Sequence, residues 1–457
     1  MTADPRRRLA LDALLAVGRG RSLESALGDL RGELSPGKDA AVAEELVRGA
    51  LQWQGRYDFL VRRFSRREPN RDPVVRGVLH LALHQLLTSR AVPTYAAVHQ
   101  AGELLRAARR PRAVGYVNAV LQALQRHLAI EEASDRLAAA HRLFIDATGD
   151  EVDYLAAWWS HPRWLVERWY ERYGPAETAA LLEHANTPPP LTLHVLPPRS
   201  VEAAKAALAA AGVDSTTRPD QPRALRLGRR LERSRLRDLL AEIPGLVVQD
   251  AGAQAVVDWL TRGGAALADA GGPAVDCCAA PGGKTVHLRS LLAPARLLVA
   301  LDLHPRRLGR VRENRDRLRL DGVALVAGDA IRPPLRCGSC AVVLVDGPCS
   351  GTGVGRHHPE GRWRLAPATL DRNAGRLREL ANAAADLLGA GGSLYYATCS
   401  LEPEENEEVV AALLDSRDDL EPDPDSDGRY VRAWLPWRHD TDGFFAARLR
   451  RRDRSAG

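Results

Sequence analysis

The sequence lacks any apolar run approaching the roughly 20 residues that a membrane-spanning helix requires. Basic residues precede an apolar stretch at the N-terminus, as in a signal peptide. However, Asp12 interrupts that stretch, no small-residue cleavage site follows it, and its apolar positions repeat as on an amphipathic helix. The sequence therefore predicts neither a signal peptide nor a membrane association.

Cysteine is absent from the first half of the chain. The six cysteines are Cys277, Cys278, Cys337, Cys340, Cys349 and Cys399. This distribution differs from the even spread that forms a disulfide framework in secreted proteins. We therefore expect a protein of the reducing cytoplasm.

Lysine is almost missing too, since it occurs only at Lys38, Lys205 and Lys284, and nearly all of the 64 basic residues are arginine. A genome rich in G and C, whose codons favour arginine, accounts for this bias without a functional cause. The net charge of +6 favours an anionic partner such as nucleic acid. The length of 457 residues exceeds one ordinary hydrophobic core and predicts two to four domains.

The stretch "VDCCAAPGGKTVHL" (275–288) contains Gly-Gly-Lys-Thr but lacks the glycine that a phosphate-binding loop needs five residues before Gly283, where Cys278 stands instead. It also lacks the Gly-x-Gly-x-x-Gly of a nicotinamide-dependent dehydrogenase. Both nucleotide-binding interpretations are therefore disfavoured, and another ligand is needed to explain the loop.

Residues 6 to about 130 are predicted to be helical throughout, and in five stretches apolar residues recur every three or four positions. The predicted helices span 6–17, 40–64, 72–89, 93–108 and 113–128. We expect a helical bundle over residues 1–130, followed by a linker and a small intermediate domain over 131–246. The aromatic run within 161–174 is predicted to be core rather than a platform for stacked bases.

From residue 247 onward, strand and helix patterns alternate. Predicted strands span 274–279, 296–303, 323–330, 341–348 and 392–400, and predicted helices span 283–293, 305–320 and 370–390. This alternation predicts an α/β domain over 247–457 with a doubly wound, mostly parallel sheet. Ligands bind beyond the carboxyl ends of such strands. The notable residues at those ends are Pro281 to Lys284, Asp302, Asp329, Asp346, Cys349 and Cys399.

Two of these strand ends deliver a thiol. In "LVDGPCSGTGVGRHHPEGRW" (344–363), Cys349 follows Asp346 by three residues in a glycine-rich loop, and in "LYYATCSLEPEENEEVV" (394–410), Cys399 leaves the strand. Two thiols at adjacent strand ends can face one cavity, whereas structural cysteines are usually buried within strands. Two inert core cysteines remain the alternative.

Other candidates are weaker. Asp302 follows Asp276 at nearly the spacing of an acid that binds a ribose diol, but a helix N-cap is as common at that place. Cys337 and Cys340 form a Cys-x-x-Cys without a second pair, so we expect an incidental surface loop and no metal site. The adjacent histidines at 357 and 358 lie in a polar loop and are predicted to serve loop structure or RNA contacts.

The motifs "DCCAAPGGKT", "LVDGPCSGTG" and "YYATCSLEPEENEEVV" together resemble those of RNA cytosine-C5 methyltransferases of the NOL1/NOP2/Sun family. The N-terminal half, with "PTYAAVHQAGELL" and "VNAVLQAL", resembles the NusB-like domain of the bacterial 16S rRNA members. The resemblance covers nearly the whole chain. It implies an all-α, NusB-like RNA-binding domain before a Rossmann-like class I methyltransferase domain.

The resemblance also implies the cofactor, S-adenosylmethionine, and the residues that hold it. These are Cys278, Ala279, Ala280, Pro281, Gly282, Gly283, Lys284, Asp302, Asp329 and Asp346. The cofactor's carboxylate suits the N–H-rich turn, Asp302 suits the ribose and Asp329 the adenine. Whether Lys284 meets that carboxylate or an RNA phosphate stays open.

For catalysis, the resemblance makes Cys399 the nucleophile that attacks C6 of the cytosine and assigns Cys349 to release of the product. Asp346 is implied to bind the N3 edge of the base. The chain departs from the family at Gly347 and Cys277, where alanine is usual. Neither change removes a reacting atom.

The implied substrate is an unstacked cytosine of 16S rRNA. One alternative is a cytosine of tRNA. Another is an RNA-binding or antitermination factor with an inert methyltransferase half, against which the presence of both Cys349 and Cys399 argues. The sequence identifies neither the nucleotide nor the oligomeric state, and a monomer is compatible with it.

Overall fold

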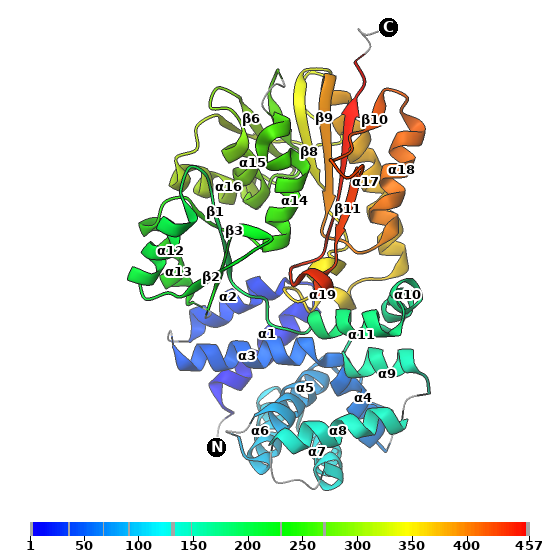
Figure 1. The fold of residues 1–457 in the computed structure, drawn as a ribbon. Coiled ribbons are helices and arrows are strands. Elements are labelled where there is room, and N and C mark those ends of the chain that lie inside the picture. Colours follow the sequence, from blue (N-terminus) through cyan, green and yellow to red (C-terminus); the bar gives the residue numbers. More distant parts are fainter. Residues whose placement is uncertain are drawn as a thin grey trace. The chain divides into compact units, whose positions relative to one another are not determined.

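The computed structural model describes residues 3–34, 37–66, 68–89, 92–128, 133–147, 149–228, 231–267 and 271–453. These residues form two compact units, both drawn in Figure 1. Unit 1 comprises Met1–Thr187 and Gly355–Arg364, and unit 2 comprises Pro188–Val354 and Leu365–Gly457. The finer division at residues 130 and 246 stays a prediction, and its first boundary lies outside the described residues.

Unit 1 is helical in its described residues. Its α-helices are α1 (Pro5–Gly18), α2 (Leu23–Glu33), α3 (Lys38–Gln52), α4 (Gln54–Phe64), α5 (Pro73–Thr88), α6 (Thr94–Ala107), α7 (Val114–Leu128), α8 (Ala133–Ala147), α9 (Glu151–Trp158), α10 (Arg163–Tyr173) and α11 (Pro175–His184). The predicted helical bundle is confirmed. Helix α2 lies within the region predicted to be helical but outside the five stretches named, and the single helix predicted over 40–64 is instead α3 and α4, on either side of Trp53.

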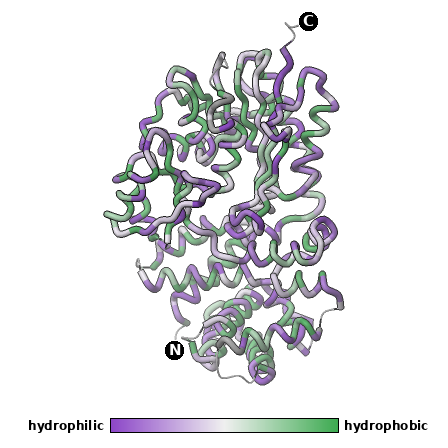
Figure 2. Tube along the Cα trace, viewed as in Figure 1, coloured by the Kyte–Doolittle hydropathy of each residue, from purple (hydrophilic) through white to green (hydrophobic). Residues whose placement is uncertain are grey.

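Local sequence signals explain where these helices begin. The side chain of Asp4 accepts from the backbone N–H of Arg6, and that of Asp72 accepts from Val74. A proline follows each of these aspartates and suits the first helical turn, where its missing N–H has no partner to lose. In Figure 2 green and purple stretches alternate along these helices, because each helix buries one face in a shared core.

The segment Gly355–Arg364, which follows the Cys349 loop in sequence, is part of unit 1. Arg362 is 5% exposed and donates to the carbonyl oxygens of Ser160 and Ala185 and to Oδ1 of Asn186. Burial lowers the pKa of Arg362 to about 9. A buried guanidinium that satisfies several carbonyl oxygens at once fixes the segment to the helices.

Unit 2 contains a small antiparallel sheet of strand order β2-β3-β1-β4. Its elements are β1 (Thr192–Val195), α12 (Val201–Ala210), β2 (Ser215–Arg218), β3 (Gln221–Leu227), α13 (Arg233–Glu242) and β4 (Leu246–Val248). This βαββαβ order is the ferredoxin-like arrangement. A small domain was expected in this part of the chain, but its topology was not predicted.

The larger sheet of unit 2 has the strand order β10-β12-β9-β8-β5-β6-β7, with β11 paired to β12. Its strands are β5 (Ala274–Asp276), β6 (Leu298–Asp302), β7 (Val323–Ala327), β8 (Cys340–Asp346), β9 (Leu388–Thr398), β10 (Leu420–Pro422), β11 (Val431–Trp434) and β12 (Phe444–Arg451). The strands β5 to β9 are mutually parallel, and β10 to β12 add antiparallel pairs. The predicted doubly wound, mostly parallel sheet is confirmed, whereas the three C-terminal strands were not predicted.

Helices cover both faces of this sheet (Figure 1). They are α14 (Ala251–Thr261), α15 (Gly283–Leu291), α16 (Pro305–Leu318), α17 (Pro367–Leu387) and α18 (Glu407–Ser416), followed by the short α19 (Pro436–His439). Side chains of β8 alternate between the two cores, with Val343 on the α17 side and Leu344 on the α14 side. No helix among the described residues is long and apolar enough to cross a membrane.

The small sheet packs beside the start of α15. Leu196 and Val247 form one apolar cluster with Val286 of α15. The buried rings of His194 and His287 meet edge to face, with centroids 4.1 Å apart. The ferredoxin-like part therefore supports the helix that follows the Pro-Gly-Gly turn.

We predict that Arg362→Ala lowers the free energy of unfolding by about 3 kcal/mol, because it leaves several buried acceptors without a donor. Urea denaturation followed by circular dichroism measures the change. The exposed Arg62 of α4 provides a control, and Arg62→Ala should cost less than about 0.5 kcal/mol. Equal, small effects of the two variants would show that the buried contacts of Arg362 do not hold the segment.

Candidate active site at the carboxyl edge of the large sheet

The parallel strands bring the predicted site residues to one edge of the sheet. Asp276, Asp302 and Asp346 are the last residues of β5, β6 and β8. Cys399 directly follows β9, and Asp329 lies two residues beyond β7. The placement at strand ends that the sequence predicted is therefore confirmed.

The turn between β5 and α15 exposes backbone donors. Gly282 has a φ of +109°, and a Cβ there would lie 3.2 Å from the Cα of Val311, so only glycine suits this position. Gly282 is the N-cap of α15 and provides no side-chain oxygen. The N–H groups of the first turn are therefore available to an anionic group. Next to them, Cys278 donates its backbone N–H to Oδ1 of Asp276 at 3.3 Å.

Asp302 is 5% exposed and joins the turn to the next helix. Its Oδ2 accepts from the N–H of Ala280 at 3.2 Å, and its Oδ1 accepts from His304 at 2.9 Å. Each carboxylate oxygen keeps lone pairs for a further donor, such as a hydroxyl. Asp329 is exposed, and its Oδ1 accepts from the N–H of Ile331 at 3.0 Å.

Lys284 and Asp346 form an ion pair, with Nζ and Oδ2 2.8 Å apart. The Lys284 ammonium also lies 4.9 Å from the ring centroid of Phe444 in β12. Burial alone would lower the pKa of Lys284, but the charge and hydrogen bond of Asp346 raise it above its ordinary value. Lys284 is therefore a cation, and in this structure its partner is the Asp346 carboxylate.

Cys349 and Cys399 lie with their Sγ atoms 3.4 Å apart, and both thiols are half-buried. The contact with Cys399 is the first cause that raises the pKa of the Cys349 thiol, and burial and the nearby Glu405 carboxylate raise it further. The N–H of Gly353 donates to the carbonyl oxygen of Cys399 at 2.9 Å, which joins the two loops.

A polar network joins the residues that follow the two thiols and was not predicted from the sequence. Glu405, at the end of the turn η5 (Pro403–Glu405), is 0% exposed and accepts from Ser350, the residue after Cys349. Ser350 Oγ lies 3.2 Å from Oγ of Ser400, the residue after Cys399. The only signal was the acidic run "EPEENEE", which resembles an exposed face.

The two departures from the family motifs have local explanations. A Cβ at position 347 would lie 2.2 Å from Cδ2 of Leu377, so that side chain occupies the space of an alanine methyl group. Cys277 is 2% exposed, and burial raises the pKa of its thiol well above the ordinary value. Neither residue alters the groups at the sheet edge.

The remaining candidates lie elsewhere. Cys337 is exposed, but Cys340 begins β8 and is 2% exposed, so the expectation of a surface loop was wrong for Cys340. His357 and His358 belong to the unit 1 segment, and His358 lies 3.9 Å from the Glu360 carboxylate. No group of three or more potential metal ligands occurs in the part of the chain that the structure describes.

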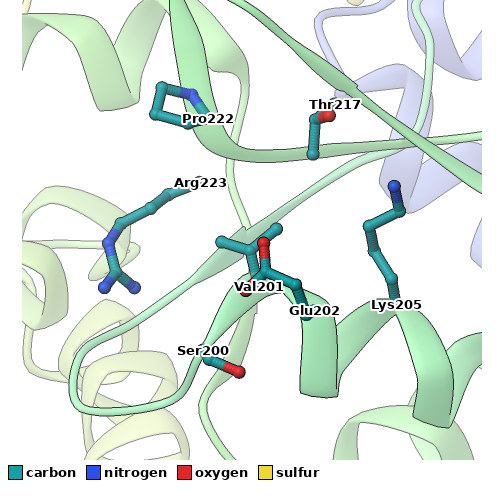
Figure 3. A pocket seen from close by; sticks show the side chains of 7 residues that line it. All are labelled: Ser200, Val201, Glu202, Lys205, Thr217, Pro222 and Arg223. Carbon is teal, nitrogen blue, oxygen red and sulfur yellow. The ribbon is translucent and has the colours of Figure 1, made fainter.

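The ferredoxin-like part contains a pocket of about 540 Å³ between α12 and the strands β2 and β3 (Figure 3). It is lined by Ser200, Val201, Glu202, Lys205, Thr217, Pro222 and Arg223. Arg223 already donates to the carbonyl oxygens of Val195 and Arg199. The pocket contains none of the predicted site residues.

Three family models match successive parts of the chain. The NusB family model matches residues 4–126, and the ferredoxin-like domain of RsmF/B-like methyltransferases matches 161–232. The model of the 16S rRNA methyltransferases RsmB/F matches residues 268–450, which contain all six cysteines, Cys349 and Cys399 among them. These matches follow the order helical part, small sheet, large sheet.

Complete relatives and solved structures agree with this order. The chain is 32% identical over 460 residues to ribosomal RNA small subunit methyltransferase B of Klebsiella pneumoniae (strain 342), and the match covers 98% of each chain. The crystal structure of PH0851 matches with a TM-score of 0.77 at 22% identity, over 98% of this chain and 99% of that one. NSun6 from Pyrococcus horikoshii with SFG matches with a TM-score of 0.53 at 20% identity, over 64% and 98%.

The buried Asp276 generates a prediction about pH. Burial raises its pKa to about 7, although Thr285 Oγ1 donates to it at 2.7 Å. The ordinary pKa of 3.8 applies to the unfolded chain, so folding favours the protonated form. The contribution of Asp276 to the free energy of unfolding therefore falls as pH rises from about 4 to about 7.

We predict that Asp276→Asn, which cannot ionise, removes this dependence. Between pH 5 and 7 the wild-type free energy of unfolding should fall relative to the variant by up to about 1.4 kcal/mol per pH unit. Urea denaturation at several pH values measures the difference. Asp371→Asn on the exposed face of α17 is the control. Parallel pH profiles for wild type and Asp276→Asn would contradict the raised pKa.

Proposed function

Because the chain belongs to the RsmB/F family of 16S rRNA methyltransferases, we propose that it methylates C5 of a cytosine in 16S rRNA through a covalent cysteine adduct. The observation that carries this proposal is the pair of thiols, Cys349 and Cys399, with Sγ atoms 3.4 Å apart. Cytosine C5 is a poor nucleophile, and a thiolate that adds at C6 activates it. A second thiol beside the first can serve the later proton transfer.

The residues around the Pro-Gly-Gly turn fit S-adenosylmethionine as methyl donor. When bound, this cofactor supplies an electrophilic methyl group. The uncapped first turn of α15 suits its carboxylate, and the buried Asp302 keeps lone pairs for the ribose hydroxyls. The exposed Asp329 suits the adenine. The crystal structure of NSun6 with SFG, a protein of the same fold, supports a cofactor of this class.

In the proposed first step, the Cys399 thiolate attacks the base. Its electron pair forms an Sγ–C6 bond, and the electrons of the C5–C6 double bond make C5 nucleophilic toward the methyl group. As the adduct forms, its N3 takes up a proton from water, which it gives back when the product is released, and the Asp346 carboxylate accepts a hydrogen bond from this N3–H. Lys284 holds this carboxylate in place through the 2.8 Å ion pair and so orients it toward the base.

In the proposed second step, Cys349 releases the product. A Cys349 thiolate takes the proton from C5, the C5–C6 double bond forms again, and the Sγ–C6 bond breaks. The bonding pair returns to Cys399 as a thiolate. The two neighbouring thiols therefore act in succession. Cys399 bonds to C6, and Cys349 then removes the proton from C5.

The substrate proposal rests on the relatives and on unit 1. The curated relative is named for the small-subunit ribosomal RNA, which favours rRNA over tRNA. The NusB family match covers the helical part, whose arginines suit contacts with phosphates. A base must leave its stack to reach a site at a sheet edge, so we expect an RNA loop or single strand as substrate.

Substitution of each cysteine separates their roles. Cys349→Ala should permit attack but stall before elimination, leaving protein joined to RNA. Cys399→Ala and the double variant should form no such link. The measurement is a slow-migrating, RNase-sensitive band on a denaturing gel after incubation with 16S rRNA and S-adenosylmethionine.

The opposite pattern is equally informative. A band with Cys399→Ala instead would reverse the two roles. If neither single variant formed a band and both still methylated RNA, the cysteines would be structural and the covalent mechanism would fail.

Loss of the Asp302 carboxylate tests the cofactor site. Asp302→Ala should weaken the binding of S-adenosylmethionine by about 1 to 3 kcal/mol, the usual cost of losing a buried hydrogen-bond partner. Isothermal titration calorimetry measures the affinity, and Asp371→Ala on the exposed face of α17 is the control. An unchanged affinity in a folded Asp302→Ala protein would refute the assignment of Asp302 to the ribose.

A further inference from the structure

Glu405 is a fully buried carboxylate whose hydrogen-bond partners are neutral. Its Oε1 accepts from the N–H of Ser350 at 2.8 Å and from Nδ2 of Asn373 at 2.9 Å. Its Oε2 accepts from Oγ of Ser350 at 2.6 Å. Among the residues that the structure describes, no lysine, arginine or histidine side chain forms an ion pair with Glu405. A buried charge without a counterion is costly, so its presence calls for a role beyond packing.

The hydrogen bonds of Glu405 reach both cysteine loops. Ser350 directly follows Cys349, and its Oγ lies 3.2 Å from Oγ of Ser400, which directly follows Cys399. The hydroxyl of Tyr396 also donates to the backbone carbonyl of Glu405. The carboxylate is therefore held at a fixed place, beside the residue that follows Cys349.

The charges around the two thiols are arranged asymmetrically. The Glu405 carboxylate accepts at 2.8 Å from the N–H of Ser350, the amide that is bonded to Cys349, and its charge opposes a negative charge on that thiol. Of the other groups nearby, Asp346 is paired with Lys284, and Arg378 of α17 faces Tyr396 and lies 3.8 Å from Glu408. Neither of these reverses the asymmetry.

We propose that Glu405 is a positioning residue that keeps the proton of the thiol pair on Cys349 and leaves the negative charge on Cys399. The inference rests on the proposed function, in which Cys399 attacks first. Two thiols 3.4 Å apart do not ionise independently, so a charge fixed beside one of them decides which is the thiolate. Glu405 would thus set the order in which the two cysteines act.

The order follows from proton and electron balance. At rest, the proton is on Cys349 and the reactive electron pair is on Cys399. Once that pair forms the Sγ–C6 bond, Cys399 carries no charge, and the main cause that opposes ionisation of Cys349 disappears. Cys349 then gives its proton to solvent and accepts the C5 proton. One proton is released per methyl group, as the reaction requires.

Thiol labelling tests the inference without RNA or cofactor. The full chain is treated briefly with iodoacetamide across pH 6 to 9, and mass spectrometry measures the alkylation of Cys349 and Cys399. With Glu405, Cys399 should react first. With Glu405→Gln, which removes the charge but keeps the size, alkylation of Cys349 at pH 8 should rise about tenfold, the effect of one pKa unit on thiolate population.

Two further variants separate charge from packing. Glu405→Asp keeps the charge and should keep the preference for Cys399. Glu407→Gln on the exposed side of α18 makes the same chemical change outside the site and should leave both rates unchanged. In the Cys399→Ala background, Glu405→Gln should still speed the alkylation of Cys349, since the Glu405 charge acts on Cys349 directly.

The inference is overturned if Glu405→Gln leaves the two labelling rates unchanged, if Cys349 reacts first in the wild-type chain, or if Glu405→Asp loses the preference as Glu405→Gln does. Loss of RNA adducts in the Cys349→Ala protein would instead refute the covalent mechanism. Because labelling uses neither RNA nor cofactor, the two failures are distinguishable.

Discussion

The parallel pairing of β8 with β9 is the constraint on which the site depends. Asp346 is in register with Ala397, and the N–H of Gly347 donates to the carbonyl oxygen of Ala397 at 3.0 Å. This register lets the two strands end side by side, so that the loops carrying Cys349 and Cys399 leave the sheet together. A slip of one residue would turn each side chain of a strand to the other face and separate the thiols.

In the proposed mechanism, the surrounding polar groups make the two thiols different. Lys284 and Asp346 form an ion pair, whereas Glu405, which accepts from the N–H next to Cys349, has only neutral hydrogen-bond partners among the described residues. Electrostatic effects are large here because the groups are buried or half-buried. In the proposed mechanism, this difference lets two identical side chains act in a fixed order, which a single thiol in the same loop could not do.

The sequence predicted the features that depend on periodicity and strand ends. The parallel strands, the helices between them and the edge that gathers Asp302, Asp346, Cys349 and Cys399 all follow from alternating apolar patterns. Chain segments whose partners are distant in sequence were not predictable in the same way. The acidic run around Glu405 resembles a solvated face, and only the tertiary fold shows that its carboxylate is buried against Ser350 and Asn373.

Dependence on partners that are distant in sequence also explains the other structural features that the sequence did not predict. Nothing local shows that residues 355–364 join the helices of unit 1, because Arg362 obtains its acceptors from residues about 180 to 200 positions away. The break at Trp53 is marked by no proline, and β10 to β12 obtain their stability from pairing with β9 and with one another rather than from strong strand patterns.

The central claim is that this enzyme forms 5-methylcytosine in 16S rRNA through Cys399. Bisulfite sequencing of total RNA from the parent strain, a deletion strain and a deletion strain complemented with Cys399→Ala tests it most directly. We expect one protected cytosine in 16S rRNA that is lost on deletion and is not restored by the variant. Protection that persists in the deletion strain, or that moves to a tRNA position, would contradict the claim.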